Sequence, residues 1–189
     1  MLSRSAIACL LALLAAGCTK ESPAPEQANA VAPTSDEAPA QAPALKAGTV
    51  DRSHKGEAMP VAKMTDLAGK AVEAARFRGK PLLVNLWATW CAPCVAEMPA
   101  LDAAAAGLPA VALNQGEDAA KIQAFLGRVP VQHLQPLLDP AMAVSVALPA
   151  NLPTTLLYDA QGREIWRVAG ARDWASAESR ALIAEAGQQ

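Results

Sequence analysis

The chain has 189 residues, of which 52% are hydrophobic and 18% charged. This composition supports one buried core with appended segments and excludes a protein that is disordered throughout. The formal net charge is −2 and the lysines and arginines are scattered along the chain, so the sequence offers no basic surface and excludes nucleic acid as a partner.

Residues 1–17 have the composition of an export signal. Arg4 supplies a positive charge, residues 6–16 form an uncharged apolar run, and Gly17 ends the run with a small residue. This run is shorter than the roughly 20 apolar residues that a membrane-spanning helix needs. We therefore expect residues 1–17 to act as a signal peptide.

Cys18 follows the apolar run directly, in the sequence LLAAGC. This sequence resembles the lipobox of bacterial lipoproteins. The resemblance implies that Cys18 is lipidated and becomes the mature amino terminus, so that acyl chains hold the protein on a membrane surface. Ordinary cleavage after a small residue is the alternative.

Residues 18–47 are rich in Ala, Pro, Glu, Gln and Ser, with five prolines and almost no large apolar side chains. Such a segment cannot bury enough surface to offset the entropy of ordering it, so we expect an extended, mobile tether. Globular patterning begins at residue 48, and we expect residues 48–189 to form one domain.

Within this expected domain the pattern alternates between strand and helix. The turn sequence LAGK at residues 67–70 leads into a short strand at 71–72. Residues 82–87 form a nearly continuous apolar, β-prone run, typical of a central strand buried on both faces. The remaining expected elements are a helix from residue 91 or 92 to 106, a strand at 109–114, a helix at 118–126, a short helix at 142–147, a hairpin of strands 154–158 and 164–168 whose second strand alternates, and a helix at 174–186. This order predicts an α/β fold with a mixed central sheet and helices on both faces.

Only two of the four cysteines belong to the expected domain, because Cys9 lies in the signal and Cys18 at its end. Cys91 and Cys94 form a Cys-x-x-Cys pair between a buried strand and a helix, the usual setting of a redox motif. Backbone N–H groups and the dipole at the helix start favour a thiolate at Cys91, which is the expected nucleophile. Cys94, one turn further in, is expected to resolve the mixed disulfide.

Three other uses of the cysteine pair fit the sequence less well. A zinc site needs two further ligands, yet the domain has no other cysteine, and His54 and His133 lack paired spacing. Covalent haem attachment needs a histidine after the second cysteine, where Val95 stands. A purely structural disulfide would close a loop too small to stabilise the fold much. A redox centre is therefore the best interpretation.

Three segments together resemble the TlpA and ResA group of membrane-tethered, thioredoxin-like proteins of the bacterial periplasm. They are NLWATWCAPCVAEMP at residues 85–99, LPTT at 152–155 and LYDAQGREIWRVAG at 157–170. The resemblance implies a thioredoxin-like fold with an amino-terminal extension and thiol:disulfide oxidoreductase activity. Members of this group usually reduce disulfides in apocytochrome c or in copper-delivery and oxidase proteins. No dissociable cofactor beyond the Cys91–Cys94 disulfide is expected, and the implied partner is a membrane electron donor of the DsbD or CcdA kind.

By the same resemblance, Pro153 matches the cis-proline that faces the two cysteines in this fold. A cis bond there would expose backbone groups of Leu152 that can pair with a substrate strand. Trp90 abuts Cys91 and is expected to line the substrate groove, or to cover the disulfide as a lid. The full set of expected substrate-binding residues is Trp90, Ala92, Pro93, Leu152 and Thr154.

Asn85 stands where ordinary thioredoxins have a buried aspartate, in agreement with the TlpA-like group. An amide cannot take a proton from Cys94. Glu97, three residues after Cys94 and on the same helical face, is the expected substitute acid and base. The alternative is that Glu97 is a solvated acid stabilised by the helix dipole.

The sequence thus predicts a monomeric reductase of protein disulfides, held in the bacterial periplasm by a lipid on Cys18. Two other functions remain open. One is a Cu(I)-binding assembly module that uses the two thiolates as ligands. The other is a disulfide oxidase or isomerase, because direction depends on a reduction potential that spans about −270 to −120 mV among proteins with this motif.

Overall fold

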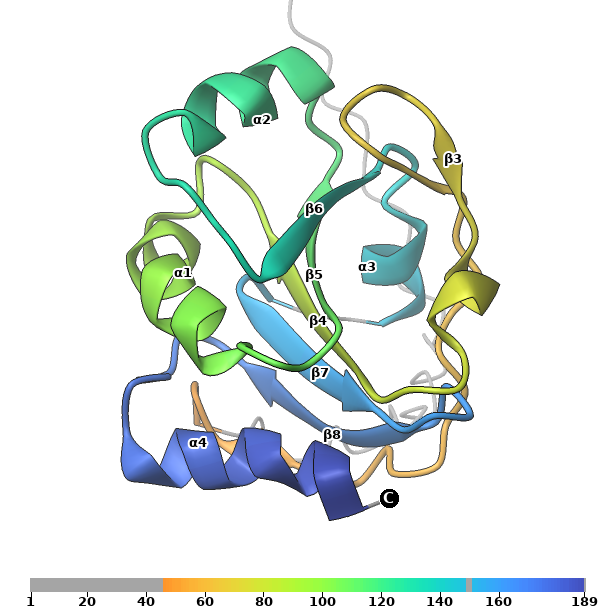
Figure 1. Cartoon of the computed structure of the whole chain (residues 1–189), viewed down its shortest axis with the longest axis vertical. Helices are drawn as coiled ribbons and strands as arrows, with labels where there is room; N and C mark the ends of the chain where they lie inside the picture. Colours follow the sequence, from red (N-terminus) through yellow and green to blue (C-terminus); the bar gives the residue numbers. More distant parts are fainter. Residues whose placement is uncertain (1–45, 149–150, 189) are drawn as a thin grey trace, which may run out of the picture. The chain divides into compact units, whose positions relative to one another are not determined.

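The structure is a computed structural model, which describes residues 46–148 and 151–188 (Figure 1). The expected signal peptide at residues 1–17, the expected lipidation site Cys18 and the expected tether up to residue 45 lie outside these residues. No helix within the described residues is both long and apolar enough to cross a membrane.

One mixed sheet forms the centre of the described part of the chain. Its strands are β1 (Val50–Asp51), β2 (Met64–Thr65), β3 (Ala71–Val72), β4 (Leu82–Trp87), β5 (Ala110–Gln115), β6 (Leu134–Asp139), β7 (Thr154–Tyr158) and β8 (Glu164–Ala169). They lie in the order β1-β8-β7-β4-β5-β6-β2-β3. β4, β5 and β6 are parallel, whereas β7 runs antiparallel to β4 and β8 antiparallel to β7. The expected mixed sheet is therefore confirmed, with β4 near its middle.

Helices cover both faces of this sheet (Figure 1). The helices are α1 (Ala92–Ala104), α2 (Ala119–Leu126), α3 (Ala143–Ala147) and α4 (Ala177–Ala184), with 3₁₀ turns at η1 (Ala74–Phe77) and η2 (Glu185–Gln188). α1, α2 and α4 supply buried side chains to one apolar cluster, and α3 and η1 pack on the other. This layering confirms the expected thioredoxin-like α/β architecture.

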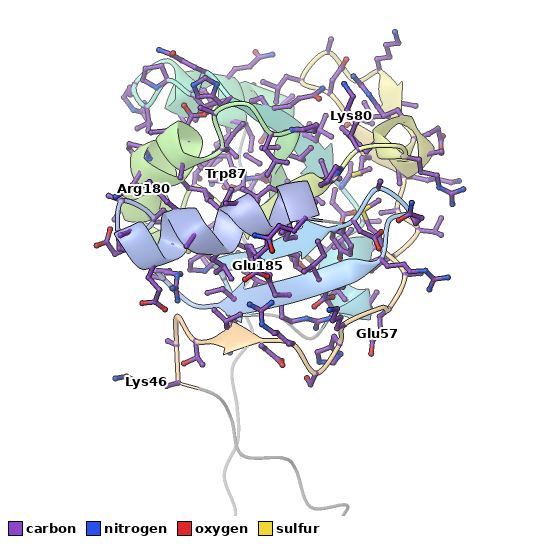
Figure 2. The ribbon with its side chains drawn as sticks, turned by 60° about the horizontal axis from the view of Figure 1, so that its bottom comes forward. Lys46, Glu57, Lys80, Trp87, Arg180 and Glu185 are labelled. Atoms are coloured by element: carbon purple, nitrogen blue, oxygen red, sulfur yellow. A yellow bond between two sulfur atoms is a disulfide. The ribbon has the colours of Figure 1, made fainter. Side chains whose placement is uncertain are left out.

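Alternation of side chains along β4 explains why there are two apolar clusters. Leu83 and Trp87 belong to the cluster under α1, α2 and α4, whereas Leu82 and Leu86 belong to the cluster under α3. Trp87 accordingly lies inside the fold (Figure 2). All six residues of β4 are buried, including Asn85, which by alternation points to the same face as Trp87. The one polar residue of β4 therefore faces α1.

β6 is a strand that the sequence pattern does not predict, because Pro136 lies inside it and proline is rare in paired strands. β5 pairs with β6 along its whole length, but β2 reaches β6 only at Leu138. Pro136 therefore lies in the part of β6 that has a neighbouring strand on one side only, where a missing backbone donor is tolerated.

The carboxy-terminal elements differ in part from their expected form. α4 begins at Ala177 rather than at residue 174, and the Ser176 hydroxyl accepts a hydrogen bond from the backbone N–H of Ser179 as its N-cap. The expected alternation in β8 is wrong, because Glu164 and Arg167 are buried along with the apolar residues. These two side chains neutralise one another through two hydrogen bonds of 2.6 and 2.7 Å, so a charged pair is accommodated inside the fold.

Candidate active site

Cys91 and Cys94 lie where the chain leaves β4 and enters α1. A disulfide joins them, with 1.95 Å between the sulfurs and 5.3 Å between the Cα atoms. Cys91 is the N-cap of α1, and its Sγ accepts a hydrogen bond of 3.3 Å from the backbone N–H of Cys94. This N–H donor and the helix dipole both stabilise negative charge on the Cys91 sulfur. The geometry supports Cys91 as the nucleophile.

The surface around the disulfide is exposed and partly apolar. Cys91 is 5% exposed and Cys94 only 1%, so Cys91 is the more exposed residue of the two. Trp90 is 68% exposed, and Ala92 and Pro93 are exposed beside it. The Trp90 indole thus presents most of its surface to solvent beside Cys91, and both expected roles, groove lining and lid, stay predictions.

The peptide bond between Leu152 and Pro153 is cis, as expected from the resemblance. Thr154, the next residue, pairs with Leu86 in the ladder between β7 and β4, so Pro153 lies at the same edge of the sheet as the two cysteines. The carbonyl of Pro153 accepts a hydrogen bond of 2.7 Å from the N–H of Gly170. The structure thus brings the cis-proline to the redox site, while its contact with substrate stays a prediction.

Glu97 is a buried carboxyl group of α1, only 7% exposed, so the alternative of a solvated acid is wrong. Asn85 Nδ2 donates hydrogen bonds of 3.3 Å to Glu97 Oε1 and 2.9 Å to Thr155 Oγ1. The backbone N–H of Arg172 donates to Glu97 Oε2 at 3.1 Å. Donors from β4 and from the segment after β8 therefore fix the position of this carboxyl group behind Cys94.

Burial raises the pKa of Glu97 from its ordinary value of 4.5 to about 7. The hydrogen bonds from the Arg172 N–H and from Asn85 lower it by less than burial raises it. The indole of Trp174 acts in the same lowering direction, although its N–H does not reach hydrogen-bond geometry. A carboxyl group with a pKa near neutrality can both take and release a proton at physiological pH, which is the property that a general base needs.

A shallow surface groove leads from solvent to Glu97. It runs between α1 and the segment 171–174, and its lining includes Pro93, Ala96 and Ala100 on one side and Ala171, Arg172 and Trp174 on the other. The groove gives the carboxyl group a route for proton exchange that does not pass through the disulfide.

Arg172 holds one wall of this groove in place. Its Nε donates to Ser179 Oγ at 2.8 Å, its Nη2 to Glu178 Oε1 at 2.8 Å, and its Nη1 to the carbonyl of Gly48 at 2.7 Å. The same residue donates its backbone N–H to Glu97. The Arg172 side chain is thus held by α4 and by the segment around Gly48, and in this way it positions the backbone N–H that donates to the buried acid.

A second carboxylate, Glu117, follows β5 and contacts the segment just before Cys91. Its side chain is 7% exposed and accepts from the N–H and the hydroxyl of Thr89 at 2.7 and 2.6 Å, from Asn114 Nδ2 at 2.8 Å, and from Lys121 Nζ at 2.6 Å. Burial alone would raise the pKa of Glu117, but the hydrogen bonds from Lys121, Thr89 and Asn114 outweigh it and lower the pKa to about 2. The group is a carboxylate throughout the physiological range.

Thr155, Arg172 and Glu117 were not among the residues that the sequence pointed to. For Glu117 a signal existed, because the polar run NQGE begins at the carboxyl end of a strand parallel to β4, and the carboxyl ends of parallel strands meet at one edge of a sheet. Arg172 and Thr155 carry no comparable signal. Their partners Glu97 and Asn85 are 75 and 70 residues away in the chain.

Metal binding has little support from the geometry. Within residues 46–148 and 151–188, no three side chains of His, Cys, Asp or Glu are placed to hold a metal ion. The two thiols of Cys91 and Cys94 are soft ligands of the kind that Cu(I) prefers, so the Cu(I) alternative rests on them alone.

Comparisons with known proteins show the family of the chain. The Redoxin family profile matches residues 54–182. The thiol:disulfide interchange protein DsbE of Vibrio cholerae is 33% identical over 126 residues, which cover 63% of this chain and 68% of that protein. The thiol-disulfide oxidoreductase ResA of a Bacillus thuringiensis strain is 28% identical over 120 residues, which cover 61% of this chain and 69% of that protein.

Solved structures show the same fold. A crystal structure from Chlorobium tepidum, assigned as a thiol:disulfide interchange protein DsbE, superposes with a TM-score of 0.60 and 25% identity, covering 69% of this chain and 96% of the other. The fold, the Cys-x-x-Cys pair at the start of α1 and the curated relatives all indicate the same chemistry. The chain therefore belongs to the Redoxin family, in which it is a thiol:disulfide oxidoreductase of the DsbE and ResA type.

Proposed function

We propose that the protein is a membrane-tethered reductase in the bacterial periplasm, acting on disulfides of apocytochrome c or of copper- and oxidase-assembly proteins. The observation that carries this proposal is the pairing of a stabilised sulfur at Cys91 with a buried acid, Glu97, whose pKa is raised to about 7. A reductase must deprotonate its second thiol in every cycle, and Glu97 is suited to receive that proton.

The reaction starts from the reduced dithiol. The Cys91 thiolate attacks one sulfur of the substrate disulfide, a bond forms between the two proteins, and the other substrate sulfur leaves as a thiolate that takes up a proton. Cys94 then gives its proton to Glu97 and attacks Cys91 Sγ, which releases the second substrate thiolate. Two electrons have passed from the dithiol to the substrate, and the Cys91–Cys94 disulfide remains.

Glu97 can serve this cycle because of where α1 places it. Cys94 and Glu97 are three residues apart in one helix and are both buried, so they share the inward face of α1. The proton that Glu97 receives can leave through the groove along Ala96 and Ala100. Glu97 is then ionised again before the next substrate arrives.

Substrate binding is proposed for the apolar surface around Trp90 and for the backbone of Leu152. None of the hydrogen bonds found within residues 46–148 and 151–188 uses the N–H or the carbonyl of Leu152, and these two groups are the proposed partners of a substrate strand. Ala92 and Pro93 are exposed beside the disulfide, whereas Thr154 is buried in β7 and would act only by positioning Pro153.

The tether and the electron supply belong to the same proposal. A lipid on Cys18 would keep the domain at a membrane surface. The oxidised protein needs a fresh pair of electrons for each turnover, so a membrane thiol donor of the DsbD or CcdA kind is the proposed partner, with no dissociable cofactor and a monomeric enzyme.

The reduction potential of the Cys91–Cys94 pair tests the direction of the reaction. The protein is equilibrated in thiol/disulfide buffers and tryptophan fluorescence is followed, because Trp90 adjoins the disulfide. We expect a potential near the reducing end of the range of about −270 to −120 mV. A potential near the other end would overturn the reductase and indicate an oxidase or isomerase.

Variants of the two cysteines provide the controls. Cys91→Ser should lose all reduction of a disulfide-bearing peptide, and undiminished turnover by this variant would contradict the proposal. Cys94→Ser should accumulate the mixed disulfide with the peptide, because the resolving thiol is missing. Retention of one Cu(I) per protein against a competing chelator, without reductase activity, would indicate the copper-binding alternative.

A further inference from the structure

The segment Ala88–Cys91 forms a turn between β4 and α1, and this turn presents Trp90 to solvent. The N–H of Cys91 donates to the carbonyl of Ala88 at 3.1 Å, which closes the turn. Trp90 lies inside the turn and is 68% exposed. A side chain this exposed has few contacts of its own to fix it, so its position depends on the backbone beneath it.

Glu117 is the group that ties this turn to the neighbouring strand. The N–H of Thr89 donates to one carboxylate oxygen at 2.7 Å and the hydroxyl of Thr89 to the other at 2.6 Å. Asn114, at the end of β5, donates a further hydrogen bond of 2.8 Å and accepts one of 3.3 Å from the Glu117 N–H. Thr89 is thus held by both oxygens of a carboxylate that is itself fixed to β5.

From this geometry we infer that Glu117 is a positioning residue for substrate recognition. It fixes the turn Ala88–Cys91 through Thr89, and this turn places Trp90 beside Cys91, where a protein disulfide would bind. The role differs from that of Glu97, because the hydrogen-bond partners found for Glu117 within the described residues are Thr89, Asn114 and Lys121. It carries no proton in the cycle, and its carboxylate charge is balanced by Lys121 at 2.6 Å.

If Glu117 has this role, it should affect the rate of reaction with large disulfides more than the rate with small ones. A peptide disulfide must contact the surface around Trp90, whereas a small aromatic disulfide such as 5,5′-dithiobis(2-nitrobenzoic acid) needs only the Cys91 thiolate. Loss of the Glu117 contact should therefore slow the reaction with the peptide and leave the reaction with the small reagent nearly unchanged.

The test uses the reduced full chain and measures second-order rate constants with both disulfides. In Glu117→Gln one carboxylate oxygen becomes an NH2 group, so either the bond from the Thr89 N–H is lost or the bond with the Thr89 hydroxyl reverses direction and loses its charge assistance. We expect the rate constant with the peptide disulfide to fall by about fivefold, equivalent to one net hydrogen bond. The rate constant with the small reagent should change by less than about twofold, because the thiolate is not touched.

Matched variants separate this role from a general effect on folding or charge. Glu185→Gln makes the same chemical change in an ion pair with Arg52, at 2.7 Å, and should leave both rate constants unchanged. Thr89→Val should reproduce Glu117→Gln because it removes the hydroxyl donor, whereas Thr89→Ser should restore the rate because it keeps the donor.

Hydrogen exchange gives a readout that does not depend on substrate. The amides of Thr89 and Cys91, which donate to Glu117 and to the Ala88 carbonyl, should exchange about tenfold faster in Glu117→Gln, while those of β4 and β7 stay protected. Unchanged exchange at Thr89 would overturn the inference, as would equal slowing with both disulfides. A wild-type protein inert towards peptide disulfides would instead contradict the proposed reductase, and the exchange experiment would still decide the role of Glu117.

Discussion

At the scale of single residues, Glu97 and Glu117 are two glutamates near the same disulfide whose pKa values are shifted in opposite directions. Both are largely buried, yet the pKa of Glu97 is raised to about 7 and that of Glu117 is lowered to about 2. No cationic side chain of residues 46–148 and 151–188 forms an ion pair with Glu97, and desolvation dominates its pKa. Glu117 has four donor groups, one of them the ammonium of Lys121, and these outweigh its burial.

The raised pKa of Glu97 makes stability depend on pH. Between pH 4.5 and about 7 the folded protein binds a proton that the unfolded chain has released, so the free energy of unfolding falls as pH rises through this window. The shift corresponds to a loss of about 3 kcal/mol, complete above pH 7. Denaturant unfolding of the wild type at several pH values should show this slope, and Glu97→Gln should flatten it.

Exposed Glu73 supplies the control for that measurement. Glu73→Gln removes a carboxyl group that lies at the surface, so its stability profile should follow the wild type. A slope that persists in Glu97→Gln would mean that another group is responsible for the pH dependence.

At the scale of secondary-structure elements, Asp102 joins α1 to the segment that leads into β6. Its carboxylate accepts hydrogen bonds from the backbone N–H groups of Gln132, His133 and Leu134, at 2.8 to 3.1 Å. Burial alone would raise the pKa of Asp102, but these N–H groups hold it below its ordinary value. One side chain thus anchors the start of a strand that has a proline inside it.

Asp102→Ala should lower the free energy of unfolding by at least about 2 kcal/mol, because it leaves backbone N–H groups without an acceptor. Asp118 is the comparison, since it caps α2 through one hydrogen bond to the Lys121 N–H at 2.9 Å in an exposed position. Asp118→Ala should cost about 1 kcal/mol, as is usual for a lost N-cap. Equal losses in urea unfolding would contradict the special role of Asp102.

The elements that could be predicted from sequence are those whose signal is local. β4 has a continuous apolar run, and α1 begins at the Cys-x-x-Cys pair, so both were placed within one or two residues of their observed bounds. β6 was missed because its local signal is contradicted by Pro136 and only the pairing with β5 makes it a strand. β1 has two residues and exists through its pairing with β8.

The site divides in the same way. The two cysteines, Pro153 and Glu97 could be found from spacing and from the family resemblance. The burial of Glu97, by contrast, follows from side chains and backbone that reach it from β4 and from the segment after β8. Arg172 lies in no recognisable motif. Its contact with Glu97 could not be predicted, because it forms only when the segment after β8 packs against α1 in the folded domain.

At the scale of the whole molecule, membrane attachment is proposed to depend on a part of the chain separate from the redox site. Replacing Cys18 by Ser would remove the acceptor for lipid and leave the domain intact. We expect the Cys18→Ser protein to take up no labelled fatty acid and to keep an unchanged reduction potential. Uptake of label after this change would argue against lipidation at Cys18.

Under the proposed tethering, the contact between Gly48 and Arg172 would have a mechanical consequence. Lys46, the first described residue, projects beside β1 (Figure 2). Two residues later, the Gly48 N–H donates to the Ala169 carbonyl at 2.8 Å, and the Gly48 carbonyl accepts from Arg172 Nη1 at 2.7 Å. A pulling force applied to the amino-terminal side of the domain loads these two bonds before it loads β4 or the disulfide. Tension would therefore act on Arg172, whose N–H donates to Glu97, before it acts on Cys91 or Cys94.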